Sequence, residues 1–227
     1  TKKEEETGTL PFTVDTLFTD CAGADRHLQD SMYAMLDFFK AVRIARLEIN
    51  NRYREPDHDP FFEQFNALHL TDGETALCPS VLVTLDSDTL AEADIGTLMG
   101  ILSTDLPVKI LIQLDRLYDV AGNRPDAPIM PSWLSRLAGM AMAMNHVYVL
   151  QTPLSHVSLL KSGFLDGCRC RGPALFAVYT GNADHHPELP VYLNTAAALE
   201  SRAFPAFTFD PGKGDSLADR LDIHANP

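Results

Sequence analysis

The segment from Pro107 to Leu114 reads PVKILIQL, and it decides the fold class. Its apolar residues follow one another almost without a break, and a proline stands at its start. Such a run is typical of a strand that is buried on both faces of a parallel sheet. Four more runs share the pattern: PSVLVTL at 79–85, HVYVLQ at 146–151, PALFAVYT at 173–180 and PAFTF at 205–209.

Segments with helical spacing of apolar residues separate these runs. We expect helices at 90–102, 132–144, 155–165 and 189–203, which gives the order β-α-β-α-β-α-β-α-β. Strands that alternate with helices in this way predict parallel pairing with right-handed crossovers. The expected fold class is therefore α/β, a three-layer αβα arrangement with a mostly parallel sheet.

The N-terminal third of the chain has a different pattern. Residues 1–10 carry five charges and are expected to form a tail or linker. A long amphipathic helix is expected at 24–53, a turn at 54–60 and a short helix at 61–68. We expect a single α/β domain at 11–227. Because the chain starts at Thr1 and ends directly after a structured-looking stretch, we expect it to be a fragment of a longer polypeptide.

The charge of the chain argues against two classes of partner. Its 227 residues include 18 Lys and Arg against 31 Asp and Glu, a formal net charge of −13. Nucleic acids and anionic membranes attract Lys and Arg, so neither is an expected partner. No apolar stretch is long enough to span a bilayer, and no signal peptide is recognisable. The four cysteines are Cys21, Cys78, Cys168 and Cys170. They lack Cys-x-x-Cys spacing and fit a reducing compartment, so a soluble, cytoplasmic protein is expected.

Polar residues directly after the apolar runs are the candidate functional residues. Ligands of parallel α/β sheets bind beyond the carboxyl ends of the strands. A Mg²⁺ ion that holds a diphosphate needs carboxylate oxygens at fixed positions there, and Asp86 and Asp119 are in such places. An Asp at a strand end is also a good helix N-cap, as Asp88 would be, and on composition alone capping is the more common role.

The sequence lacks the common nucleotide-binding and serine-hydrolase motifs. No Gly-x-Gly-x-x-Gly turn, P-loop or Gly-x-Ser-x-Gly elbow is present. Gly96 and Gly100, four residues apart, predict close packing of a helix on the sheet.

The segment 98–122, LMGILSTDLPVKILIQLDRLYDVAG, resembles the thiamine-diphosphate-binding domain of pyruvate:ferredoxin (flavodoxin) oxidoreductases and related 2-oxoacid oxidoreductases. Further stretches agree with that family in the same order, and the resemblance covers about residues 79–227. They are DIG at 94–96, MNHVYVLQ at 144–151, GPALFAVY at 172–179 and AAALESRAFPAFTFD at 196–210.

The resemblance implies a cofactor-binding module of a 2-oxoacid oxidoreductase-like protein that is not catalytically complete alone. Thiamine diphosphate and Mg²⁺ would be the cofactors, with Asp86 and Asp119 as metal ligands. The other residues expected around the cofactor are Ser87, Asp88, Tyr118 and Gly122. The family's Gly-Asp-Gly motif is here Leu85-Asp86-Ser87, and Asp119 stands where the family has an asparagine.

The resemblance also bears on partners and clusters. Thr180-Gly181 stand where the family has a cluster cysteine, so no iron-sulfur cluster is expected in this fragment. The expected partners are other domains of the parent chain and a second copy of this chain. For a homodimer, Phe38, Phe39 and the pair Phe61-Phe62 offer apolar area to cover.

Two other interpretations stay open. The missing glycines favour a degenerate structural or dimerisation domain that no longer binds the cofactor. A generic flavodoxin-like binding domain is the third, but it needs an anion-binding nest after a strand, and the sequence offers none.

Overall fold

A computed structural model describes residues 16–66, 69–75, 77, 81–87, 90, 94–120, 129–181, 189–224 and 226–227. The expected tail at 1–10 lies outside these ranges. The chain divides into two compact units, each treated by itself below: a sheet unit (residues 1–21 and 80–227) and a helical unit (residues 22–79). The single domain expected at 11–227 stays a prediction.

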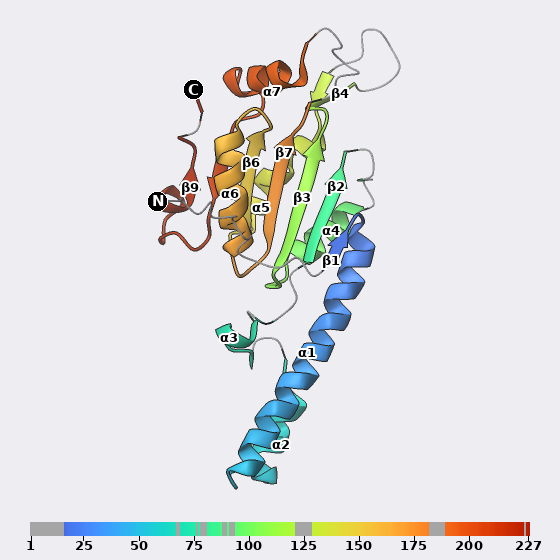
Figure 1. Cartoon of the computed structure of the whole chain (residues 1–227), viewed down its shortest axis with the longest axis vertical. Coiled ribbons are helices and arrows are strands. Elements are labelled where there is room, and N and C mark those ends of the chain that lie inside the picture. Colours follow the sequence, from blue (N-terminus) through green and yellow to red (C-terminus); the bar gives the residue numbers. More distant parts are fainter. Residues whose placement is uncertain are drawn as a thin grey trace, which may run out of the picture. The chain divides into compact units, whose positions relative to one another are not determined.

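The sheet unit is built on a seven-stranded sheet with the order β1-β2-β3-β7-β6-β8-β9 (Figure 1). The first five strands in this order pair in parallel, and β8 and β9 pair antiparallel. The strands are β1 (Thr16–Phe18), β2 (Val81–Asp86), β3 (Val108–Leu114), β6 (Tyr148–Pro153), β7 (Ala174–Tyr179), β8 (Phe207–Phe209) and β9 (Leu221–Asp222). All five apolar runs are therefore strands, and the five lie side by side.

The direction of the last run differs from the expectation. β8 runs antiparallel to β6, with Thr208 opposite Leu150, so the expectation that all five strands point one way is wrong for this strand. The chain leaves β7 at the end where the parallel strands finish, and it enters β8 from that same end. An apolar run as short as PAFTF carries no signal of its direction.

Helices cover both faces of the sheet, which confirms the three-layer α/β fold. Figure 1 shows α6 on one face, with α4 and α5 on the other. This agrees with right-handed crossovers, because the chain moves in opposite directions along the sheet through α4 and through α6. The helices are α4 (Asp94–Leu102), η2 (Trp133–Arg136) leading into α5 (Leu137–Ala143), α6 (Val157–Arg169), α7 (Val191–Glu200) and α8 (Leu217–Arg220).

Two glycines of α6 allow this helix to lie close to the sheet. A Cβ atom at Gly163 would lie 2.8 Å from a methyl carbon of Leu150, and one at Gly167 would collide with the rings of Phe176 and Tyr148. At Gly96 and Gly100 of α4, the pair expected to pack closely, a Cβ would meet nothing within 4 Å. That expectation is wrong, because the two α4 glycines face away from the sheet and are exposed.

Lys109 is an ion inside the sheet. Its side chain is 1% exposed, and Nζ donates hydrogen bonds to the carbonyl oxygens of Cys170 (2.6 Å) and Gly172 (2.7 Å). Burial disfavours the charged form and lowers the pKa of Lys109 to about 8. The ammonium group thus ties β3 to the turn between α6 and β7.

The helical unit consists of α1 (Cys21–Ile49), α2 (Glu55–Glu63) and α3 (Asp72–Thr75). The long helix is confirmed, but α2 begins within the expected turn at 54–60. A proline in the first turn of a helix is tolerated because its missing N–H would have no helical partner, and Pro56 is in that position.

Arg43 links the elements of this unit. Its guanidinium forms a two-pronged ion pair with Glu74, donates to the carbonyl oxygen of His69 (2.9 Å) and lies 5.0 Å from the ring centre of Phe65. Glu74 also accepts hydrogen bonds from the backbone and hydroxyl of Thr71. The bonds from Arg43, followed by those from Thr71, lower the pKa of Glu74 to about 2.

Among the described residues, no helix has both the length and the apolar character needed to cross a membrane.

Candidate functional site

The loops that follow the parallel strands leave the sheet at one edge. Leu114 at the end of β3, Tyr179 of β7 and Pro153 of β6 are in register, so the residues after them emerge side by side. We call this the carboxyl edge. From it, β3 leads to α5 on one face and β6 leads to α6 on the other (Figure 1). Such a divergence of connections is where open α/β sheets bind ligands.

Asp86 and Ser87 stand at the end of β2, as expected, but they differ in exposure. Asp86 is exposed, whereas Ser87 is only 6% exposed. The Ser87 hydroxyl donates to the carbonyl oxygen of Gln113 (3.1 Å) and accepts from the backbone N–H of Asp115 (3.0 Å). Ser87 therefore joins the ends of β2 and β3, and its proton is already committed within the sheet.

The residues expected after β3 lie in a separate ribbon. Strand β4 (Tyr118–Val120) pairs antiparallel with β5 (Ile129–Pro131), which places Asp119 opposite Met130. Figure 1 shows β4 beyond the carboxyl end of β3. Tyr118 is 47% exposed. The side chain of Asp119, and the whole of Asp88 and Gly122, lie outside the described part of the chain.

The described residues hold no ready-made metal centre. Within the ranges that the structure covers, no three His, Cys, Asp or Glu side chains gather as they would around an ion. The expected metal pair is described at only one of its two carboxylates, Asp86, so this pair stays a prediction.

Four polar side-chain atoms at the carboxyl edge are buried without a hydrogen bond from any described residue. They are Asp115 Oδ1, Ser132 Oγ, Ser155 Oγ and His156 Nδ1. Asp115 follows β3, and its Oδ1 lies 3.9 Å from Nε of Arg116. Ser155 and His156 follow β6 at the same edge. Since buried polar groups are almost always hydrogen-bonded, each of these atoms needs an explanation.

Ser132 is the most enclosed of these groups. It is 1% exposed, and its backbone N–H donates to the carbonyl oxygen of Leu117 (2.8 Å), just beyond β3. The hydroxyl of Ser132 is thus held beside the β3 loop, and within the part of the chain that the structure describes it has no hydrogen-bond partner.

Tyr179, the last residue of β7, also lies at the carboxyl edge. Burial raises its pKa, a hydrogen bond with the Asn194 side chain partly offsets this, and the nearby Asp115 carboxylate raises the pKa further. The phenol therefore stays protonated and can donate a hydrogen bond near neutral pH. Its ring centre lies 5.7 Å from that of Phe204, which fixes the side chain in the core.

This arrangement can bind a polar molecule. It combines a carboxylate, two hydroxyls, a phenol and an imidazole along the ends of neighbouring strands. Ser155 and His156 do not form a nucleophile–base pair, because neither side-chain atom has a hydrogen-bond partner among the described residues. Sequence reasoning did not single out Ser132, and it considered the adjacent Ser155 and His156 only as a nucleophile–base pair, an interpretation that it set aside. The signal that could have found them is that each is a polar residue directly after or before a buried apolar segment.

No protein-family model matches the chain, and no curated protein matches it.

Proposed function

We propose that this chain is the cofactor-binding-type module of a 2-oxoacid oxidoreductase-like protein, and that its ligand binds at the carboxyl edge. The observation that carries the proposal is a group of buried polar atoms on Asp115, Ser132, Ser155 and His156 that make no hydrogen bond with any described residue. Each buried polar group left without a hydrogen bond costs about 1–3 kcal/mol, so a polar ligand that pairs with them would bind favourably.

Thiamine diphosphate with Mg²⁺ is the first ligand to test, because the sequence resembles domains that bind it. Asp86 fits the role of a metal ligand, since its carboxylate is exposed at the end of β2. Asp119, on the neighbouring ribbon, would be the second ligand. When bound, this cofactor supplies carbanion chemistry at its thiazolium ring. The chain itself would grip the diphosphate and hold it in place.

Two residues on either side of Asp86 do not fit this role. Ser87 was expected beside the cofactor, yet its hydroxyl is used by Gln113 and Asp115. Leu85, in place of the family's first glycine, is buried in the core. Neither position lets the backbone approach a diphosphate as closely as glycine would. This observation favours the second candidate function, a structural or dimerisation domain that has lost the cofactor.

A thermal-shift and calorimetry experiment separates the two candidates. Thiamine diphosphate with Mg²⁺ should stabilise the chain by about 2.7 kcal/mol at a ligand concentration 100-fold above Kd. The Asp86→Asn variant should lose this effect. The matched control, Asp105→Asn, removes an exposed carboxylate between α4 and β3 at the opposite edge and should keep it. No response of the wild-type chain at millimolar ligand would support the structural domain instead.

The proposal includes partners and a compartment. Phe38 and Phe61 are exposed in the helical unit, which supports their burial against a second copy or against other domains of a parent chain. Phe39 and Phe62, expected to contribute as well, are already buried. Cys21, Cys168 and Cys170 form no disulfide within the described residues, in keeping with a reducing cytoplasm. Sedimentation equilibrium of the wild-type chain and of Phe38→Lys tests the homodimer.

A further inference from the structure

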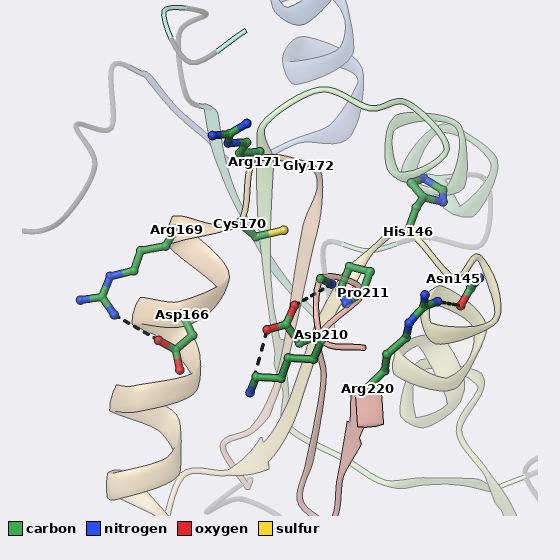
Figure 2. Close-up of a pocket in the computed structure, with 12 residues that line it drawn as sticks. Asn145, His146, Asp166, Arg169, Cys170, Arg171, Gly172, Asp210, Pro211 and Arg220 are labelled. Atoms are coloured by element: carbon green, nitrogen blue, oxygen red, sulfur yellow. Dashed lines mark hydrogen bonds and ion pairs between the residues drawn. The ribbon is translucent and has the colours of Figure 1, made fainter. Parts of the chain in front are cut away.

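A hollow opens at the edge of the sheet opposite to the carboxyl edge, where the parallel strands begin. It has a volume of about 810 Å³ and is formed by the turn before β6, the turn between α6 and β7, and the loop after β8 (Figure 2). We call it the amino-edge hollow. Its lining is Asn145, His146, Asp166, Arg169, Cys170, Arg171, Gly172, Asp210, Pro211, Gly212, Lys213 and Arg220.

The charge of this hollow is opposite to that of the chain. Four of the lining residues are Lys or Arg and two are Asp, an excess of two positive charges, whereas the whole chain carries −13. A concave surface of one sign concentrates the field and raises the local concentration of ions of the other sign. The hollow therefore favours anions although the chain as a whole repels them.

Arg220 is held in place for such a contact. Its Nη1 donates to Oδ1 of Asn145 (2.9 Å) and its Nε donates to the carbonyl oxygen of Gly214 (3.1 Å). These bonds use two of the five N–H groups of the guanidinium. Figure 2 shows this side chain reaching toward Asn145 at one side of the hollow. A guanidinium fixed in this way binds an oxyanion at a small entropic cost.

The acidic residues are already occupied. Asp166 pairs with Arg169 (3.1 Å) at the end of α6, where a cation also offsets the negative end of the helix dipole. Asp210 accepts a hydrogen bond from the backbone N–H of Gly212 (2.9 Å), and its second oxygen lies 3.9 Å from Nζ of Lys213. Each Asp therefore offsets one cation of the lining, and the remaining excess of two positive charges attracts an anion.

His146 contributes no free nitrogen to the hollow. Its Nδ1 and Nε2 lie 2.9 Å from the carbonyl oxygens of Met144 and Leu102 respectively. The ring is thus fixed by the backbone and is left out of the proposed contacts.

The floor of the hollow adds a further positive charge. The carbonyl oxygens of Cys170 and Gly172, both lining residues, accept hydrogen bonds from the buried ammonium group of Lys109. These carbonyl oxygens therefore point toward an interior cation, which offsets the repulsion that they would exert on an anion. Lys109, on the adjoining strand, supplies a charge that solvent screens poorly.

We propose that the amino-edge hollow binds a small anion with two or more phosphate groups, without a metal ion. The cations of the lining come from two parts of the chain, the turn between α6 and β7 and the segment after β8, so they match several charged groups better than a single phosphate. This site lies at the other edge of the sheet from the proposed cofactor site and does not depend on it.

Isothermal titration with inorganic tripolyphosphate, in buffer with EDTA and at a fixed ionic strength of about 0.1 M, tests the proposal. The wild-type chain should bind saturably. Arg220→Gln should weaken binding at least tenfold, and the matched control Arg136→Gln, which removes an exposed charge from η2, should change it less than twofold. Equal loss in both variants, or no saturable binding up to 5 mM, would overturn the proposal.

Two more variants keep the test decisive. If Arg220→Gln fails to fold because Asn145 and Gly214 lose a partner, Lys213→Gln serves instead, since its only described ion pair is long. It too should weaken binding severalfold, and unchanged affinity would count against the hollow. Arg116→Gln, which removes a cation from the carboxyl edge, should bind tripolyphosphate as the wild type does. Loss of binding in Arg116→Gln would place the anion at the carboxyl edge and refute the amino-edge site.

Discussion

Replacing Ser87 by alanine tests whether this side chain serves the sheet or a ligand. Ser87 is 6% exposed, and its hydroxyl donates one hydrogen bond to the backbone of Gln113 and accepts one from the backbone of Asp115. Each such bond contributes about 1 kcal/mol net, and a buried N–H left unpaired costs more. Alanine keeps the Cβ atom, so the cavity is only the size of an oxygen. Ser87→Ala should therefore lower the free energy of unfolding by about 2 kcal/mol, a fall in Tm of about 4–8 °C for a chain of this size.

Urea denaturation followed by circular dichroism measures the effect. The control is Ser103→Ala. Ser103 is exposed directly after α4, and its hydroxyl donates to the carbonyl oxygen of Met99 (2.7 Å), so the change should stay within about 0.5 kcal/mol. Ser87→Gly, which introduces the family's residue, should be at least as destabilised as Ser87→Ala. A Ser87→Ala protein with wild-type stability would refute the reasoning. One with wild-type stability but no affinity for thiamine diphosphate would make Ser87 a ligand residue after all.

Three other predictions concern packing and buried charge. Gly167→Ala should lose about 2–3 kcal/mol, because its Cβ would lie within 2.7 Å of the Tyr148 ring, whereas Gly139→Ala, with nothing within 4 Å, should gain up to about 1 kcal/mol in thermal denaturation. Lys109 has a folded pKa of about 8 against 10.5 unfolded, so the folded state binds fewer protons above pH 8. The stability of the wild type relative to Lys109→Met should rise by about 1.4 kcal/mol from pH 7 to pH 9, and a flat difference would contradict this. Glu74 has a folded pKa of about 2 against 4.5, so its stabilisation is complete above pH 4.5 and is lost toward pH 2. The advantage of wild type over Glu74→Gln should shrink by about 1–2 kcal/mol in acid, after allowance for solvent screening, as urea titrations at each pH would measure.

The sequence predicted the strands because their signal is local. PVKILIQL and the four other apolar runs of this chain are buried, and their length and composition suffice to identify each as a strand. Short elements carry no such signal, so the ribbon of β4 and β5 and the strand β9 were not expected. The direction of β8 depends on where the chain enters the sheet, which only the tertiary fold decides.

The pairs of glycines show the same limit. Gly96–Gly100 and Gly163–Gly167 have identical spacing on helices, yet only the second pair faces the sheet. Spacing reveals that two small residues share a face, and packing decides which face it is.

The sequence predicted where the site lies but not which residues form it. Parallel strands direct function to their carboxyl ends, and the expected residues Asp86, Ser87, Tyr118 and Asp119 do follow β2 and β3. The buried groups of Ser132 and His156 could not be foreseen, because a serine or histidine in a loop is usually exposed. Whether such a group is enclosed without a partner depends on contacts between distant segments.

An amide chemical-shift titration of the ¹⁵N-labelled chain with thiamine diphosphate and Mg²⁺ tests the central claim, that the carboxyl edge binds a polar ligand, most directly. The account predicts saturable shifts at the residues that hold the buried polar atoms, Asp115, Ser132, Ser155 and His156, whether or not Gly212 and Lys213 of the amino-edge hollow shift as well. Shifts confined to the amino-edge hollow, or none at millimolar ligand, would contradict it.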